Sequence, residues 1–287
     1  MTKTKICLTI AGLDPSGGAG IIADIKTFSA FGCFATAAIS SITFQNTTGV
    51  FGAMHQTAET VRGQVEPVMQ DFEITAVKTG MLPTREVIEE TAKLIKENNL
   101  RNIVVDPVVR STSGFDLIDD VALRVLTEML FPLADIVTPN IFEAERISGL
   151  EILDKADIEK AAHIMQLMGA ANVLIKGGHF LNADRGLRKA DSPGRNATVK
   201  ERVASKRKAT DYLFLGNKIH VFESDHIETN ATHGTGCTLA AAIAANLALG
   251  MNLTDAVEIS KKFVAKAIRT ARNLGHGHSP INIAPNT

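Results

Sequence analysis

The stretch that decides the fold class is residues 5–32, KICLTIAGLDPSGGAGIIADIKTFSAFG, whose order of strand, turn and helix recurs along the rest of the chain. The first seven residues are mostly apolar and predict a strand. A glycine-rich turn follows, and residues 21–32 have the apolar spacing of a helix. A strand that runs through a tight turn into a helix is the start of a βαβ unit, so we expect a parallel sheet with helices packed against it.

The same alternation continues along the chain. Strands are predicted at 33–45, 74–80, 101–108, 135–140 and 171–178, and helices at 59–72, 85–99, 119–134, 141–149 and 155–169. A strand–turn–strand with Gly216–Asn217 as its turn occupies 211–224, and helices follow Gly236 and span 254–275. Apolar runs such as NIVVD and NVLIK are typical of strands buried on both faces. We therefore expect an α/β fold in a single domain, residues 1–287.

Composition and charge narrow the function classes. The net charge of the 287 residues is −1, with no Trp and one Tyr, which argues against a nucleic-acid-binding surface. Three widely spaced cysteines, Cys7, Cys33 and Cys237, form neither a zinc motif nor a disulfide framework, and they fit the reducing cytoplasm. The apolar N-terminal run stops at Asp14–Pro15 without a clear cleavage site, so we interpret it as a strand rather than a signal peptide.

Two segments depart from the alternating pattern. Residues 236–253 carry no charge over 18 residues, the length of a membrane span, but they are mostly alanine and include Asn246, Gly250 and Asn252. We therefore expect a buried helix and no membrane contact. Residues 182–210 hold nine Lys/Arg and three Asp/Glu, which predicts an insertion or mobile loop, either solvated or acting as a basic flap near an anionic ligand.

Two glycine-rich stretches precede predicted helices. AGLDPSGGAG, residues 11–20, fits a ligand loop and a simple tight turn equally well. HGTGCT, residues 233–238, opens a helix whose unpaired N–H groups and dipole favour an anion. In that first turn Cys237 is expected to have a lowered pKa, which makes it a candidate base or nucleophile. The alternative is that small residues there only allow close helix packing.

Polar side chains also follow three predicted strands. Asn140 and Glu143 begin a helix three residues apart, which suits either a hydrated Mg²⁺ near phosphates or a helix capping box. Asp106 and Lys176 close two apolar strands, where ligands bind in open α/β sheets, although either is also compatible with a solvent-facing strand end.

Seven motifs occur in order: AGLDPSGGAG, SSITFQNTTGV, AVKTGML, VVDPVVRSTSG, DIVTPNIFEAE, VLIKGGH and THGTGCTLAAAIAA. From about residue 5 to 280 the chain resembles the hydroxymethylpyrimidine/phosphomethylpyrimidine kinases of thiamine biosynthesis, in the ribokinase-like superfamily. The resemblance implies a three-layer α/β/α sandwich around a mainly parallel central sheet, a homodimer, and ATP with Mg²⁺. It implies two phosphorylations of 4-amino-5-hydroxymethyl-2-methylpyrimidine, which yield the diphosphate.

The resemblance also assigns residues. The pyrimidine pocket is expected to be lined by five positions: Gly12, Asp24, Gln45, Met81 and Val108. In that pocket Gln45 suits an aminopyrimidine edge, and Asp24 would accept a hydrogen bond from the amino group. The nucleotide and its metal are assigned to four positions: Lys176, Asp106, Asn140 and Glu143, with Asp106 and Glu143 holding Mg²⁺ partly through water. The anion hole is assigned to Gly234, Thr235 and Gly236, and proton transfer to Cys237, where many superfamily members have an aspartate.

Two departures from the family pattern stand out. The loop after KGGH is longer than usual, so Asp211 is expected to be the acidic residue of the nucleotide side, displaced by about twenty positions. Leu13 also replaces a smaller residue at the pocket entrance. The alternative functions are a pyridoxal/pyridoxine kinase, which shares the fold and helix-start motif, and a non-catalytic pyrimidine-binding regulator.

Overall fold

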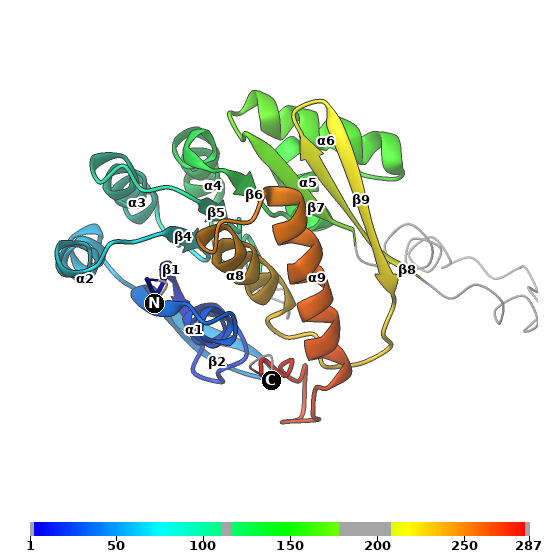
Figure 1. Cartoon of the computed structure of the whole chain (residues 1–287), viewed down its shortest axis with the longest axis horizontal. Coiled ribbons are helices and arrows are strands. Elements are labelled where there is room, and N and C mark those ends of the chain that lie inside the picture. The colour runs from blue at the N-terminus through cyan, green and yellow to red at the C-terminus, as the bar shows by residue number, and fades with distance from the viewer. Residues whose placement is uncertain (1–2, 111–115, 178–207, 285–287) are drawn as a thin grey trace, which may run out of the picture.

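A computed structural model describes residues 3–110, 116–177 and 208–284 of the chain. Nine strands form one sheet in the order β3-β2-β1-β4-β5-β6-β7-β8-β9 (Figure 1). Their bounds are β1 Ile6–Leu13, β2 Phe34–Asn46, β3 Gly49–His55, β4 Ala76–Thr79, β5 Ile103–Val105, β6 Ile136–Val137, β7 Asn172–Lys176, β8 Lys208–Leu215 and β9 Lys218–Asp225.

The six central strands, β2-β1-β4-β5-β6-β7, run parallel, whereas β3 pairs antiparallel with β2, and β8 and β9 complete the other edge antiparallel. This confirms the mainly parallel sheet. Strand β3 was not predicted from the sequence, because the two glycines and the alanine of GVFGAMH are depleted in strands. Pairing with β2 across a short turn makes it a strand.

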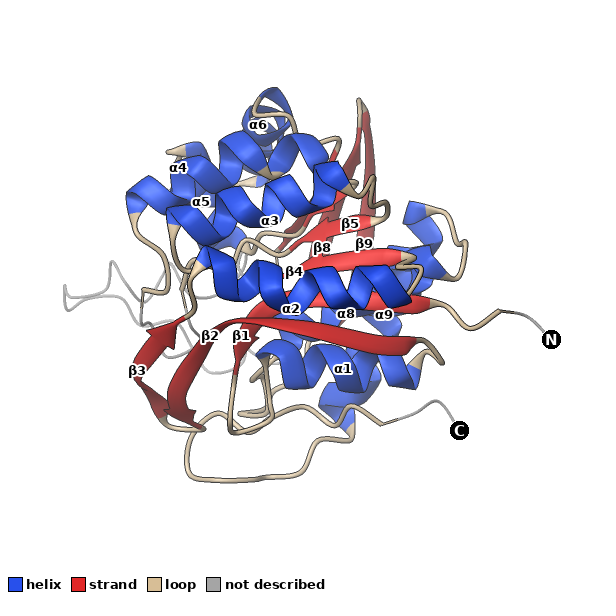
Figure 2. Ribbon diagram, turned by 90° about the vertical axis from the view of Figure 1, so that its left-hand side faces the viewer, coloured by secondary structure: helices blue, strands red, loops and turns tan. Residues whose placement is uncertain are grey.

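Helices cover both faces of the sheet (Figure 2). Their bounds are α1 Gly20–Ala30, α2 Ala58–Asp71, α3 Arg85–Glu97, α4 Asp120–Met129, the 3₁₀ turn η1 Phe131–Leu133, α5 Ile141–Ser148, α6 Lys155–Leu167, α8 Thr235–Ala248 and α9 Leu253–Arg269. One core cluster packs the helices from α2 through α6 against one face of the sheet. A second cluster packs α1, α8 and α9 against the other face. The three-layer α/β/α sandwich is thereby confirmed.

Strand β5 illustrates how the layers form. Its three residues are completely or almost completely buried, but Ile103 and Val105 belong to the cluster under α2–α6, whereas Val104 belongs to the cluster under α8. Alternate side chains of a strand point to opposite faces, so a continuous apolar run is required when helices cover both.

The alanine-rich segment forms α8, which packs between the sheet and α9. Buried Asn246 is accommodated because its amide donates to Ala242 O at 2.9 Å and to Ser260 Oγ at 3.2 Å. The helix stops at Ala248, and Gly250 follows with φ +89°, so the uncharged run does not continue as one helix. Within the described residues, we find no helix with the length and apolarity needed to cross a membrane.

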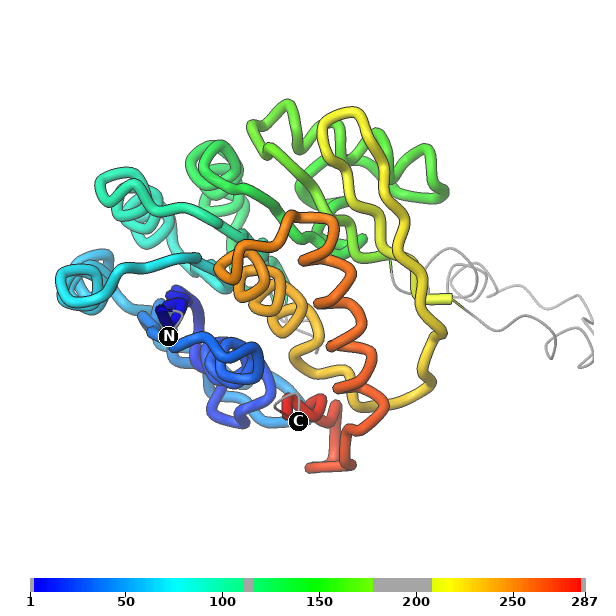
Figure 3. Tube along the Cα trace, in the orientation of Figure 1, coloured from blue at the N-terminus to red at the C-terminus, as the bar shows by residue number. Residues whose placement is uncertain are grey.

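The predicted basic insertion falls mainly on residues 182–207, which lie outside the described residues. Its C-terminal boundary was placed too late, because residues 208–210 already belong to β8, which pairs with β9 along its whole length. The segment after α9 stays at the same end of the molecule as the C-terminal end of α9 (Figure 3). There His278 N donates to Thr47 O at 2.8 Å, and His233 N donates to Ser279 O at 3.2 Å.

Candidate active site

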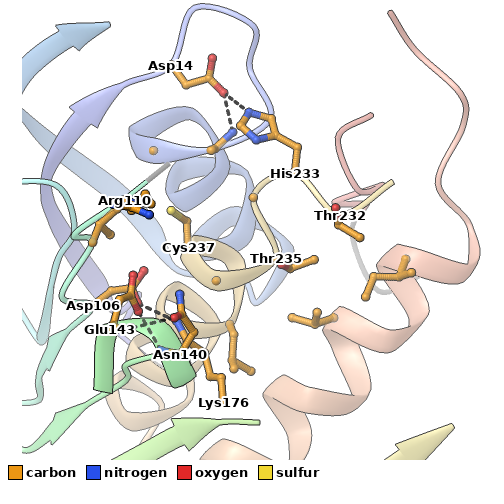
Figure 4. Close-up of a pocket in the computed structure, with 18 of the residues that line it drawn as sticks. Asp14, Asp106, Arg110, Asn140, Glu143, Lys176, Thr232, His233, Thr235 and Cys237 are labelled. Atoms are coloured by element: carbon orange, nitrogen blue, oxygen red, sulfur yellow. Dashed lines mark hydrogen bonds and ion pairs between the residues drawn. The ribbon is translucent and has the colours of Figure 1, made fainter. Parts of the chain in front are cut away.

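A cavity of about 550 Å³ follows the carboxyl ends of the parallel strands. At one end it is lined by residues of β1, β2 and the segment after β4, and at the other by residues of β8 and α9, with the start of α8 between them. Carboxyl ends of parallel strands share one edge of the sheet, which explains why residues far apart in sequence meet here. Figure 4 shows part of this lining.

Most of the site residues assigned from sequence line this cavity. They are Gly12, Gln45, Met81 and Val108 at the first end, Asp106, Asn140, Glu143 and Lys176 near the middle, and Gly234, Thr235, Gly236 and Cys237 at the start of α8. Asp211, the displaced acidic residue, and Leu13 line it as well. Their roles toward ligands remain predictions.

Asp24 is the exception and corrects the expected pyrimidine contact. Its side chain is fully buried on α1, and its Oδ2 accepts from Thr9 Oγ1 at 2.6 Å and from Lys78 Nζ at 2.9 Å. It does not line the cavity. An aspartate enclosed in this way cannot accept a hydrogen bond from a substrate in the cavity, so we interpret it as the counter-ion of Lys78.

The start of α8 has the geometry of an anion site. Gly234 is its N-cap with φ +83°, and a Cβ at this position would lie 1.8 Å from Gly18 O, so only glycine fits against the first glycine-rich loop. The amide groups of Gly236 and Cys237 have no acceptor among the described residues. Free N–H groups at the positive end of a helix dipole attract phosphate oxygens.

The prediction that Cys237 has a lowered pKa is wrong. Burial raises the pKa of the thiol to about 11; Asp106 and Asp24 add to the rise, whereas Lys78 and the Gly20 amide oppose it. The prediction included the helix dipole but not desolvation, which depends on how the sheet and α1 enclose the residue. Cys237 is therefore a thiol at neutral pH before ligands bind.

Three charged groups meet below Cys237 (Figure 4). Lys176 Nζ donates to Asp106 Oδ1 at 2.9 Å, and the same oxygen accepts from Thr138 Oγ1 at 3.0 Å. Burial raises the pKa of Glu143 to about 7, and Asp106 adds to this effect, whereas Lys176 opposes it. The Glu143 carboxyl therefore titrates near neutral pH, and a cation placed beside it would favour its ionised form.

Asn140 and Glu143 also form the capping box that was the alternative explanation. Glu143 N donates to Asn140 Oδ1 at 3.0 Å, and Asn140 N donates to Glu143 Oε2 at 2.7 Å. Both residues line the cavity nonetheless. The local motif thus fixes the two side chains at the cavity wall, and the capping and ligand-binding interpretations are compatible.

A contact between the two glycine-rich loops was missed by the sequence analysis. Asp14 Oδ2 lies 2.8 Å from His233 Nε2, across 219 residues of chain, and the same carboxylate accepts from the amides of Ser16, Gly18 and Ala19. Both residues sit inside motifs that were noticed, LDPSGG and THGTGC, but nothing in the sequence pairs them. The contact holds the first loop against the start of α8.

The Asp14 contact predicts a pH-dependent stability. Burial alone would raise the pKa of Asp14, but hydrogen bonds from His233 and Ser16 lower it to about 2. A carboxylate with a lowered pKa stabilises the fold above the unfolded value near pH 4 and loses that effect as the pH falls toward 2. We expect Asp14→Asn to lower the free energy of unfolding by about 2 kcal/mol at pH 7.

Urea unfolding of the wild type and of Asp14→Asn at several pH values measures this difference, which should shrink between pH 4 and 2. Asp71→Asn, at an exposed position near the end of α2, is the control and should show a small, constant difference. A gap that stays equally large at pH 2.5 would contradict the assigned role.

Further polar residues of the cavity were not singled out from sequence. Lys78 reaches it from β4, and Arg110 lines it near Val108. On the far side Lys261 Nζ of α9 lies 2.5 Å from Asp211 Oδ2. Lys78, Arg110 and Lys261 do not form a recognisable spacing, because three separate parts of the chain supply them.

Comparisons with known proteins agree with this geometry. The sequence profile of a family described as phosphomethylpyrimidine kinase matches residues 14–282. A hydroxymethylpyrimidine/phosphomethylpyrimidine kinase of Haemophilus influenzae is 40% identical over 283 residues, which cover 98% of this chain and 97% of that protein. The thiamine biosynthesis bifunctional protein ThiED of Geobacter sulfurreducens is 42% identical over 275 residues, 96% of this chain and 51% of that protein. The solved structure of a Staphylococcus aureus pyridoxal kinase with AMP-PCP and pyridoxal has a TM-score of 0.83 at 30% identity and covers 99% of this chain and 95% of that one.

Proposed function

The chain belongs to the phosphomethylpyrimidine kinase family, and on that basis we propose that it carries out two successive phosphorylations in thiamine biosynthesis. The first transfers the γ-phosphoryl group of ATP to the hydroxyl of 4-amino-5-hydroxymethyl-2-methylpyrimidine, and the second adds a phosphate to give the diphosphate. The observation that carries the proposal is the cavity, in which the free amides of α8 lie between the end that contains Gln45 and the end that contains Asp211 and Lys261.

The pyrimidine is proposed to bind at the β1–β2 end. There the Gln45 amide can donate to and accept from an aminopyrimidine edge, while Gly12 and Met81 lie close together, because a Cβ at position 12 would be 3.0 Å from Met81 Sδ. The nucleotide is proposed to bind toward Lys176, Asp211 and α9. The reacting oxygen and phosphorus would then meet at the first turn of α8.

The amides of Gly236 and Cys237 donate to the oxygens of the phosphoryl group as it moves between the two ends. Lys176 adds positive charge beside them, since a Cβ at Gly236 would lie 3.2 Å from its Nζ. Fixed donors and cations in this position stabilise the charge on the transferring group without reorganisation.

Cys237 is proposed as the acceptor of the hydroxyl proton. With a pKa of about 11, Cys237 is almost entirely the protonated thiol in the free protein, and only the small thiolate fraction, formed by loss of its proton to solvent, can accept the hydroxyl proton. Phosphoryl transfer tolerates this, because in a loose transition state the attacking hydroxyl loses its proton late. The fraction of Cys237 that is thiolate during the transfer depends on the positive groups that surround the sulfur.

Magnesium fits the carboxylates at the middle of the cavity. Asp106 uses Oδ1 for Lys176 and Thr138, and within the described residues nothing donates to its Oδ2. Glu143 lies in the same wall. Two carboxylates are typical for Mg²⁺, which completes its ligand sphere with waters and nucleotide phosphates. When bound, it would neutralise phosphate charge; Asp106 and Glu143 would hold it.

A pyridoxal kinase activity is the second candidate, since the Staphylococcus aureus pyridoxal kinase named above shares the fold. We expect kcat/KM for the pyrimidine to exceed that for pyridoxal by about tenfold, because one hydrogen bond to a substrate contributes up to about 1.5 kcal/mol. Gln45→Leu should reduce the ratio by lowering only the pyrimidine value. A higher kcat/KM for pyridoxal would overturn the order.

ATP consumption that depends on added pyrimidine distinguishes the enzyme from a non-catalytic regulator, which would bind the pyrimidine without turnover.

We further propose a single kinase domain that acts as a cytoplasmic homodimer. The free state of all three cysteines supports the reducing compartment. Light scattering on the purified protein tests the dimer.

A further inference from the structure

Gln45 lies on a part of β2 that extends beyond the body of the sheet. The ladder between β1 and β2 ends where Leu13 pairs with Ile42, whereas β2 continues to Asn46. Within the described residues this extension pairs with β3 alone, with Gln45 opposite Val50, so the two strands form a ribbon at the edge of the sheet (Figure 2). A two-stranded hairpin is marginally stable by itself, so Gln45 needs support from another element to keep a fixed position.

The C-terminal segment, residues 274–281, contacts the turn of this ribbon. Thr47 O accepts a hydrogen bond from His278 N at 2.8 Å. Thr47 Oγ1 accepts from the amides of His276, at 3.2 Å, and of Gly277, at 3.3 Å. Within the described part of the chain, these are the hydrogen bonds that reach the turn from outside the ribbon. A single threonine therefore connects the ribbon to the C-terminal segment.

The same segment is connected to the residues that precede α8. Ser279 N donates to Asn230 O at 3.1 Å, and His233 N donates to Ser279 O at 3.2 Å. Ser279 is buried, and its hydroxyl accepts from Leu274 N at 3.0 Å and donates to Leu274 O at 2.9 Å. These bonds close the segment on itself and hold it directly before Gly234, the N-cap of α8.

Close packing fixes the segment at both of these contacts. A Cβ at Gly277 would lie 2.0 Å from Thr47 O and 2.7 Å from Thr48 Cα. A Cβ at Gly18, in the first glycine-rich loop, would lie 2.9 Å from Pro280 Cβ. Neither contact leaves room for a further side chain, so the segment fixes the turn of the ribbon relative to the two glycine-rich loops.

We propose that the C-terminal segment holds the Gln45 ribbon in place against the start of α8, and that Thr47 is a positioning residue of the transfer reaction. Thr47 and the segment do not line the cavity, so they act through Gln45 and α8 rather than on a ligand. This inference rests on the proposed function, in which the pyrimidine binds over Gln45 and reacts at the first turn of α8.

Gly277→Ala tests the role of the segment. To relieve the contact with Thr47 O, the turn and the segment must separate by about 1 Å. A misplacement of about 1 Å can lower a rate by about 10²-fold. We expect kcat/KM for the pyrimidine to fall at least about tenfold, and KM for ATP to change less than about twofold, because the nucleotide is proposed to bind at the other end of the cavity. Steady-state assays of ADP release, with each substrate varied in turn, give these constants.

Gly49→Ala is the matched control, because Gly49 lies just after the same turn and an added Cβ meets nothing within 4 Å. Its kinetics should stay within about twofold of the wild type. Thr47→Val removes the oxygen that accepts from two amides but keeps the shape of the side chain, so kcat/KM for the pyrimidine should fall about three- to tenfold. Thr47→Ser keeps that oxygen and should restore the wild-type value to within about twofold.

The kinetic outcomes are decisive in either direction. A loss confined to the pyrimidine in Gly277→Ala supports the inference, and Thr47→Val decides it should Gly277→Ala not fold. Wild-type values for the pyrimidine in the folded variant, or KM values for ATP and pyrimidine that rise equally, overturn it.

Hydrogen exchange followed by mass spectrometry gives a measurement that does not depend on turnover. In Gly277→Ala we expect the amides of residues 45–50 and of residues 231–235 both to exchange at least about threefold faster, with no change in Gly49→Ala. If the wild type does not phosphorylate the pyrimidine but both segments respond, the proposed function fails and the connection between ribbon and helix start stands. Faster exchange of residues 45–50 alone overturns the inference, whether or not the wild type is active.

Discussion

Cys237→Ala is expected to lower kcat for pyrimidine phosphorylation by about 10²–10⁴-fold, the range contributed by a positioned acid–base group. KM for the pyrimidine should change less than about threefold, because the side chain sits at the first turn of α8, whereas the ring is proposed to bind over Gln45. Steady-state assays of ADP release at saturating ATP give both constants. The loss would lie in the transition state, since alanine removes the thiol and leaves the amides of the helix start in place.

Cys33→Ala is the matched control for this change. Cys33 is also a free cysteine, but it is buried near the opposite end of α8, with Sγ 3.9 Å from Ala245 O, and does not line the cavity. We expect its kcat to stay within about twofold of the wild type. Near-normal turnover of Cys237→Ala would remove the thiol from the mechanism.

Gly234→Ala should have the second large effect, through the backbone rather than through chemistry. The position has φ +83°, and the added Cβ would lie 1.8 Å from Gly18 O, so the two glycine-rich loops must separate. The amides of Gly236 and Cys237 then leave the path of the phosphoryl group. Losing one such donor lowers kcat by about 10²–10³-fold, and we expect a reduction at least that large, measured together with the unfolding free energy.

Gly250→Ala distinguishes the effect of the clash with Gly18 O from the effect of placing a side chain on a left-handed residue. Gly250 has nearly the same torsion, φ +89°, just beyond the other end of α8, and an added Cβ meets nothing within 4 Å. It should lower stability by about 1–2 kcal/mol, the cost of a left-handed residue with a side chain, without changing kcat. Equal losses of activity in both variants would show that strain along α8, and not the Gly18 contact, determines turnover.

The sequence predicted the layers and most of the cavity wall. Strands such as NIVVD require apolar residues throughout because helices cover both faces, and carboxyl ends of parallel strands share one edge, so Asp106, Asn140 and Lys176 were expected together. Likewise, HGTGCT at a helix start predicts free amides from backbone geometry alone. Each of these inferences depends only on local periodicity and on the rule that parallel strands are aligned.

Three features were decided only by the tertiary structure. Asp14 reaches His233 across the chain, Asp24 turns away from the cavity to pair with Lys78, and Cys237 has a raised rather than a lowered pKa. All three depend on which groups lie within a few ångströms and how much water remains around them. Desolvation and charge act through space with a strength that grows as water is excluded, and that environment exists only after α1, α8 and the sheet have packed together.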